Sequence, residues 1–168
     1  MTQDEVAVLH LINRYGVAVD SRKWDVFDEL FTGDVVADYG GGAAFNGLAA
    51  FKAGAAMAWG GFDASQHAMS NTVWDLGKET GRTLTYGGWC IIRKGTPGGD
   101  VWEGKGWYDD ELVRSKSGWR IRRRSVRVMW WSGNSRVMQS NPSAGDVQIK
   151  TYSLNDEIQG GTVGFFRK

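Results

Sequence analysis

The sequence has little of several residue types that often carry chemistry. Its 168 residues contain one cysteine, two histidines and two prolines. A single cysteine, Cys90, cannot form an internal disulfide, so we expect a protein of the reducing cytoplasm. The chain lacks Cys pairs, His pairs and any His-Glu motif with metal-site spacing, so we expect no bound metal.

The chain also lacks an excess of either charge and any long apolar run. The 20 Lys and Arg balance 19 Asp and Glu, which argues against nucleic acid or an anionic membrane as a partner. No apolar run approaches the roughly 20 residues that cross a bilayer, and the start Met-Thr-Gln-Asp-Glu does not resemble a secretory signal. We therefore expect a soluble protein whose partner is a small molecule.

Tryptophan and glycine, in contrast, are abundant, with nine and 24 residues. Nine indoles exceed what the core of one small domain usually needs, so they either fill the core or line a ligand cavity or a subunit interface. Trp102, Trp130 and Trp131 are candidates for an exposed sheet face, which leads us to expect a homodimer or homotrimer.

The apolar spacing changes along the chain from helical to strand-like. It predicts helices over residues 3–20, 24–31 and 48–59, with a short strand at 35–39 and turns at 40–42 and 46–47. Alternating segments follow. They cover residues 66–76, 82–94, 101–113 and 118–131. Three helices followed by an antiparallel meander predict an α+β fold with the helices on one face of the sheet.

We expect one main domain over residues 1–131 and a C-terminal extension over 132–168. The extension is loose and polar at first, with a predicted strand at 147–154 and an apolar end at 163–166. It could fray, close a cavity or contact a neighbouring subunit.

His67 is the better of two candidates for a general base near neutral pH. Strand alternation places it on one face with Ser65, Met69, Asn71 and Val73. Partial desolvation there favours the neutral imidazole, which can accept a proton. The alternative is a core histidine bonded to a backbone carbonyl.

Asp20 ends the first predicted helix on its apolar face, where a carboxylate needs a partner. If that partner is His67, Asp20 would fix the tautomer and stabilise the imidazolium. Alternatively, Asp20 caps the helix that begins at Trp24. Tyr15, Tyr39 and Tyr108 could donate hydrogen bonds to a carbonyl or a leaving hydroxyl, or could simply pack.

Five arginines between residues 120 and 127 resemble a nucleic-acid patch until they are assigned to the two faces of a strand. Arg120, Arg122 and Arg124 would share a solvated face. Arg123 and Arg127 would share the other, where an inward guanidinium could hold a substrate oxygen or carboxylate.

Several of these segments together resemble the polyketide-cyclase-like (SnoaL-like) branch of the nuclear transport factor 2-like superfamily, over roughly residues 4–131. The matching residues are Arg14-Tyr15 through Asp20, Trp24-Asp25, Leu30-Phe31-Thr32, Val35 to Tyr39, His67 with Asn71 and Trp74, and Gly118 to Ile121. The resemblance implies a cone-shaped roll, in which three N-terminal helices pack on a strongly curved mixed or antiparallel sheet around one apolar cavity. It also implies a catalytic pair of an aspartate on the first helix and a histidine on a strand, at Asp20 and His67.

With this resemblance we predict a cofactor-independent lyase, a dehydratase or related eliminating enzyme that could release formaldehyde, acting on a bulky apolar aromatic molecule. The predicted catalytic residues are Asp20, His67 and Tyr15, and the predicted substrate-binding residues are Tyr39, Asn71, Tyr108, Trp89 and Arg127. Val19 and the lack of a second pocket histidine make scytalone itself a poor substrate candidate. The alternatives are a non-catalytic binding or assembly module, an isomerase or cyclase acting on a polycyclic ketone, and the small subunit of a ring-hydroxylating oxygenase.

Overall fold

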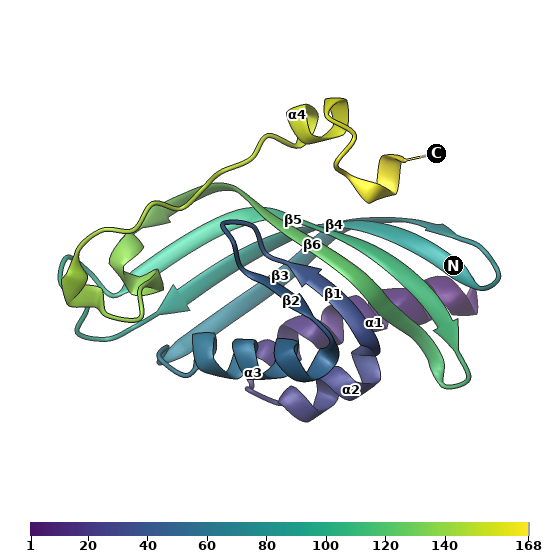
Figure 1. Cartoon of the computed structure of the whole chain (residues 1–168), viewed down its shortest axis with the longest axis horizontal. Helices are drawn as coiled ribbons and strands as arrows, with labels where there is room; N and C mark the ends of the chain where they lie inside the picture. The colour runs from purple at the N-terminus through teal and green to yellow at the C-terminus, as the bar shows by residue number, and fades with distance from the viewer. Residues whose placement is uncertain (168) are drawn as a thin grey trace.

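Three helices near the N-terminus lie against one face of a curved sheet, and the C-terminal segment lies against the other face (Figure 1). The computed structural model describes residues 1–167. Helix α1 (Gln3–Asp20) begins at Thr2, whose side chain accepts a hydrogen bond from the Glu5 backbone while the Glu5 side chain accepts one from the Thr2 backbone. This reciprocal cap satisfies two amides that the helix leaves free.

The second predicted helix is shorter than its spacing indicates. A 3-10 turn, η1 (Trp24–Val26), leads into α2 (Phe27–Leu30), and Phe31 already has the extended backbone of strand β1 (Phe31–Asp38). The prediction of a helix to Phe31 was therefore wrong. Phe31 pairs with Ile121 of the sheet and so adopts the strand conformation, although the spacing of apolar residues fits a helix. Tertiary contacts commonly override weak local preferences of this kind.

Six strands form one sheet in the order β2-β1-β6-β5-β4-β3. The four long strands predicted from alternation are present as β3 (Ala64–Leu76), β4 (Thr80–Ile92), β5 (Val101–Ser115) and β6 (Gly118–Gly133), paired antiparallel. Strand β2 (Ala44–Asn46) and the parallel pairing of β1 with β6 were not predicted. A parallel pair has no local turn signal, because its strands are far apart in the chain.

The main core lies between α1, α2, α3 (Leu48–Trp59) and the concave face of the sheet. Its most deeply buried side chains come from all of these elements. They include Val8, Ile12, Phe27, Leu30, Phe31, Val35, Phe51, Leu112 and Ile121. The predicted α+β class, with N-terminal helices on a strongly curved sheet, is confirmed.

Two register shifts reverse the faces predicted for parts of β3 and β6. In β3 the irregularity lies between Ser70 and Val73, and Asn71 there has a φ of 48°. Beyond it Thr72 turns inward, whereas Asn71 and Val73 are exposed. An extra residue in a strand moves every later side chain to the opposite face, so the inward placement of Asn71 and Val73 was wrong.

In β6 the shift occurs where Leu112 pairs with Ile121 but Glu111 pairs with Arg123. Arg122 and Arg123 are consequently both exposed, and Arg124 is fully buried. The prediction that Arg124 belongs to a solvated face was wrong.

Between β6 and residue 167 the chain forms short helical turns and no strand. These are η2 (Ser135–Met138), η3 (Pro142–Ala144), α4 (Leu154–Gln159) and η4 (Gly164–Phe166), so the strand predicted at 147–154 is absent. Val137 joins the main core, and Val163 packs with Leu84 and Trp107 in a second cluster. Within the described residues, no helix is both long and apolar enough to cross a membrane.

Candidate active site

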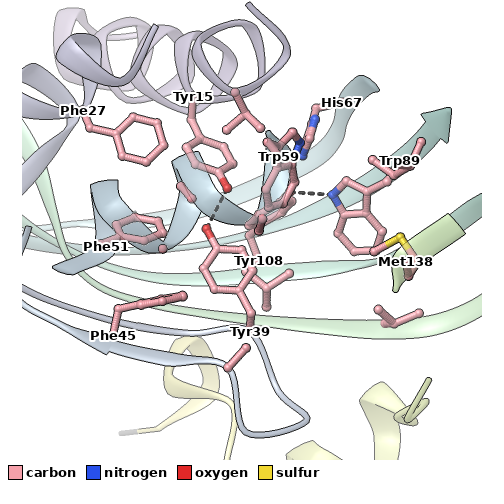
Figure 2. Close-up of a pocket in the computed structure, with 18 of the residues that line it drawn as sticks. Tyr15, Phe27, Tyr39, Phe45, Phe51, Trp59, His67, Trp89, Tyr108 and Met138 are labelled. Carbon is pink, nitrogen blue, oxygen red and sulfur yellow. Dashed lines mark hydrogen bonds between the residues drawn. The ribbon is translucent and has the colours of Figure 1, made fainter. Parts of the chain in front are cut away.

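A cavity of about 230 Å³ lies between the helices and the concave face of the sheet (Figure 2). Helices α1 and α3 and the β1–β2 hairpin form one side, and strands β3 to β6 form the other. Its lining is almost entirely apolar. It includes Tyr15, Val19, Phe27, Tyr39, Phe45, Phe51, Ala55, Trp59, His67, Trp89, Ile91, Trp102, Tyr108, Val126, Val128 and Met138. A water-poor site of this kind strengthens any hydrogen bond formed inside it.

Asp20 is brought into contact with His67, which lines this cavity. The Nδ1 atom of His67 lies 2.7 Å from Oδ1 of Asp20, and the His67 backbone N–H donates to Oδ2 at 2.7 Å. The His67 side chain is only 2% exposed. Helix α1 comes this close to β3 because residue 16 is glycine. A Cβ atom there would lie 3.1 Å from the Cβ atom of His67.

The protonation of this pair follows from its hydrogen bonds. Burial raises the pKa of Asp20, but hydrogen bonds from the His67 side chain, the His67 backbone and Ser65 lower it more, so the pKa lies below its ordinary value. An ionised carboxylate only accepts hydrogen bonds, so Nδ1 of His67 carries the proton. In a neutral imidazole with Nδ1–H, Nε2 is the ring nitrogen that can accept a proton.

Three tyrosines place their hydroxyl groups at the cavity. The Tyr15 and Tyr39 hydroxyls are 2.6 Å apart, and Nε1 of Trp89 donates to the Tyr108 hydroxyl at 2.6 Å (Figure 2). Among the described residues, one hydroxyl hydrogen of the Tyr15–Tyr39 pair and that of Tyr108 are left to donate. Burial raises the pKa of all three groups, and Arg124 offsets only part of this effect, so they are neutral donors.

A buried ion pair that was not predicted from the sequence lies behind these rings. Arg124 donates from Nε and Nη2 to the two carboxylate oxygens of Asp110 at 2.8 and 2.7 Å. Its guanidinium carbon is 4.1 Å from the ring centre of Tyr15 and 4.7 Å from that of Tyr108. Burial lowers the pKa of Arg124, but Asp110 more than compensates, so the pKa lies above its ordinary value and the charge is permanent.

The other predicted site residues divide into two groups. Tyr39, Trp89 and Tyr108 line the cavity. Asn71 and Arg127 are outside its lining. Asn71 is exposed at the β3 irregularity, and Arg127 forms an ion pair with Asp38, with Nη2 2.6 Å from Oδ2. Because the structure gives Asn71 and Arg127 no contact with the cavity, it offers no support for their predicted substrate-binding role.

Several lining residues were not predicted. Trp102 was expected on an exposed face, yet it is 3% exposed and lines the cavity. Trp59 was not singled out, although its ring lies 5.9 Å from that of His67. Two glycines make room for rings. A Cβ atom at Gly54 would lie 2.2 Å from the Phe45 ring, and one at Gly87 would lie 2.5 Å from the Tyr108 ring. The sequence did offer one signal for Gly87, because a glycine inside a strand-like segment often marks a site that another group approaches closely.

The described residues provide no metal centre at this site. No group of three or more His, Cys, Asp or Glu side chains in residues 1–167 is arranged to hold a metal ion. The chemistry that the described side chains can supply is proton transfer by His67 and hydrogen bonding by the phenols.

The sequence profile of the SnoaL-like domain matches residues 1–125, and the chain therefore belongs to the SnoaL-like domain family. No curated protein matches the sequence. Among solved structures, the Kfla4162 protein from Kribbella flavida is 21% identical, with a TM-score of 0.73, and the match covers 77% of this chain and 93% of that one.

Two further solved structures have names that refer to elimination reactions. A protein of Novosphingobium aromaticivorans, named provisionally as a scytalone dehydratase, is 18% identical, with a TM-score of 0.70 over 76% of this chain and 85% of that one. Hexachlorocyclohexane dehydrochlorinase (LinA) Type2 is 12% identical, with a TM-score of 0.68 over 76% and 86% of the two chains. At these identities the likeness establishes the fold, which is of the nuclear transport factor 2-like, cystatin-like type.

Proposed function

We propose that this protein is a cofactor-independent lyase that eliminates a small group from an apolar aromatic molecule. The observation that carries the proposal is the Asp20–His67 pair, because Asp20 occupies Nδ1 of an imidazole that lines a cavity with almost no other polar surface, which leaves Nε2 as the nitrogen for proton transfer. The elimination reactions named for two structural neighbours agree with this chemistry.

In the proposed reaction His67 Nε2 removes a proton from a carbon or hydroxyl group of the substrate. The electron pair left behind forms a new double bond, the bond to the leaving group breaks, and the leaving group takes the electron pair of that bond. Asp20 stabilises the imidazolium, which can then return its proton to the leaving group. A free hydroxyl of Tyr108 or of the Tyr15–Tyr39 pair donates to the oxygen that gains negative charge.

The size and the lining of the cavity narrow the substrate class. A volume of about 230 Å³ with aromatic walls fits a molecule of one or two rings, and the free phenol hydroxyls require an acceptor such as a carbonyl or hydroxyl oxygen. Of the described residues that line the cavity, none is a lysine or an arginine, so a strongly anionic substrate would not find a permanently charged partner there.

The proposal is tested by screening hydroxylated one-ring and two-ring aromatic compounds. Each reaction is followed by the absorbance of new conjugation and by formaldehyde release. We expect Asp20→Asn and His67→Ala each to lower kcat by about 10² to 10⁴-fold, the usual contribution of a positioned acid–base group. Asp75→Asn, which changes an exposed carboxylate on the same strand as His67, should leave turnover unchanged.

Unchanged turnover in both the Asp20 and His67 variants would contradict this mechanism. An apolar cavity by itself also suits a binding protein. If the parent protein bound these aromatic compounds without converting any of them, the function would be binding and not catalysis.

A further inference from the structure

The carboxylate of Asp20 receives three hydrogen bonds from the first residues of β3. Two come from the side chain and backbone of His67, and the third comes from the Ser65 hydroxyl, which donates to Oδ1 at 2.8 Å. The Asp20 side chain is 23% exposed, so water can compete for its oxygens. The orientation of the carboxylate therefore depends on how firmly these donors are held.

Arg22 fixes the direction of the bond from Ser65 to Asp20. Its Nη1 atom donates to the Ser65 oxygen at 2.9 Å, and also to the backbone oxygens of Val19 at 2.8 Å and Asp20 at 3.2 Å. An arginine has donors only, whereas a serine hydroxyl has one hydrogen and two lone pairs. With a lone pair occupied by Arg22, Ser65 directs its one hydrogen to Asp20.

The backbone of Arg22 ends helix α1 and directs its side chain back toward that helix. Its φ is 58°, a left-handed conformation that is common for glycine and costly for a long side chain. Arg22 follows the C-cap residue Ser21, and hydrogen bonds from the backbone N–H groups of Arg22 and Lys23 to Val19 and Ala18 close the helix end in this conformation. The guanidinium folds back onto the last carbonyl groups of the helix.

We propose that Arg22 and Ser65 are positioning residues for the Asp20–His67 pair, an inference that rests on the proposed function of that pair. Together they keep Oδ1 of Asp20 facing Nδ1 of His67. The imidazole is thereby held in the Nδ1–H tautomer, with Nε2 unprotonated and available to the substrate. Neither residue touches the substrate in this scheme.

The experiment is nitrogen-15 NMR of labelled histidine, which needs no substrate. The only other histidine, His10, is exposed on α1, so a His10→Gln background leaves the single imidazole of His67. The parent in this background should show the Nδ1–H tautomer. Ser65→Ala and Arg22→Gly should each lower the ratio of Nδ1–H to Nε2–H by about tenfold, the effect of one lost hydrogen bond to a charged group.

Two variants separate this role from a general effect on folding. Ser65→Thr keeps the hydroxyl and should keep the Nδ1–H tautomer, and Ser70→Ala on the exposed face of β3 should change nothing. Arg22→Gly removes the guanidinium while glycine adopts the left-handed backbone without strain, so this variant is expected to fold.

An unchanged tautomer ratio in Ser65→Ala and Arg22→Gly would overturn the proposal, even if their melting temperatures changed. Observation of the Nε2–H tautomer in the parent would also overturn the proposal. A change in Ser65→Ala alone would overturn the part that concerns Arg22. Absence of turnover in the parent would count against the proposed function and would leave the tautomer result as it stands, so the two failures are distinguishable.

Discussion

At this site, the charge and the protonation of single residues depend on their buried partners. Arg124, for example, lies beneath the rings of Tyr15 and Tyr108 and is neutralised by Asp110. Removing one member of such a buried pair typically costs about 3–5 kcal/mol, because the other charge is left without a partner. The positive charge behind the rings also opposes the effect of burial on the phenol groups, so it makes their hydroxyls stronger donors toward the cavity.

The pair of Asp20 and His67 should also make stability depend on pH. The pKa of Asp20 lies below its ordinary value of 3.8. A carboxyl group with a lowered pKa stabilises the fold above pH 3.8, and this contribution is lost as the pH falls through the folded-state pKa. In urea unfolding between about pH 2 and pH 6, the parent should therefore lose stability on acidification more steeply than Asp20→Asn.

Asp109 provides a control of opposite sign. Burial raises the pKa of this carboxyl group, although the backbone N–H groups of Gly164 and Phe165 donate to it. Its contribution to stability is present at low pH and is lost as the pH rises through the folded-state pKa. As the pH rises, the stability of Asp109→Asn should therefore increase relative to the parent, whereas that of Asp20→Asn should decrease relative to the parent. Identical pH profiles for all three proteins would contradict the assignment.

At the scale of elements, glycines set how closely helices and side chains approach the sheet. Gly16 lets α1 contact His67, and Gly87 lets the ring of Tyr108 lie against β4. A pocket residue such as Tyr108 is therefore positioned by the absence of a side chain on the neighbouring strand. Interiors are close-packed, so one added methyl group at such a point displaces its neighbours.

Gly87→Ala and Gly88→Ala make a matched pair for this prediction. The added Cβ atom at Gly87 would lie 2.5 Å from the Tyr108 ring, whereas at Gly88 the nearest atom would lie 3.9 Å away. Overpacking should lower the unfolding free energy of Gly87→Ala by about 1–3 kcal/mol. Gly88→Ala should be neutral or slightly stabilising. Chemical denaturation of both variants measures the difference, and equal stabilities would mean that the Tyr108 ring moves aside freely.

At the scale of the whole molecule, the chain covers both faces of its sheet. The helices and the cavity occupy the concave face, and the C-terminal segment lies on the opposite face (Figure 1). There Tyr152, Leu154, Ile158, Val163 and Phe165 pack around Leu84 and Trp107. Tyr86 and Trp130 stay partly exposed, at 38% and 46%, and the expected homodimer or homotrimer remains a prediction.

Removal of residues 150–168 should uncover this second cluster. Trp107 is 1% exposed in the full chain, and without its cover it would present apolar surface to water. We expect the shortened chain to bind more of an apolar dye such as anilinonaphthalene sulfonate and to unfold at a lower urea concentration. Phe166→Ala, at a residue that is 52% exposed, serves as the control. Unchanged dye binding would mean that the segment does not protect Trp107.

Local patterns in the sequence were sufficient for much of the architecture. Strand alternation identified the four long strands and the inward direction of His67, because it holds wherever the register is regular. The alternation gave the wrong face for Asn71 and Arg124, because a bulge shifts the alternation and no residue type reliably marks the position of a bulge. The apolar spacing of three and four residues through Phe31 predicted a helix. The prediction failed because the same spacing also fits a turn followed by a strand.

The sequence by itself determined the α+β class, the N-terminal helices and the residue types available for chemistry. The family resemblance implied the pairing of Asp20 with His67, and the tertiary structure supplied its geometry. Only the tertiary structure moved Arg124 beneath Tyr15 and placed Asn71 and Arg127 outside the cavity lining. The physical reason is that helix and strand periods are local, being set by neighbouring residues. Pairing between distant strands, the bulges that shift it and the close approach at glycines depend on contacts that form only when the whole chain is folded.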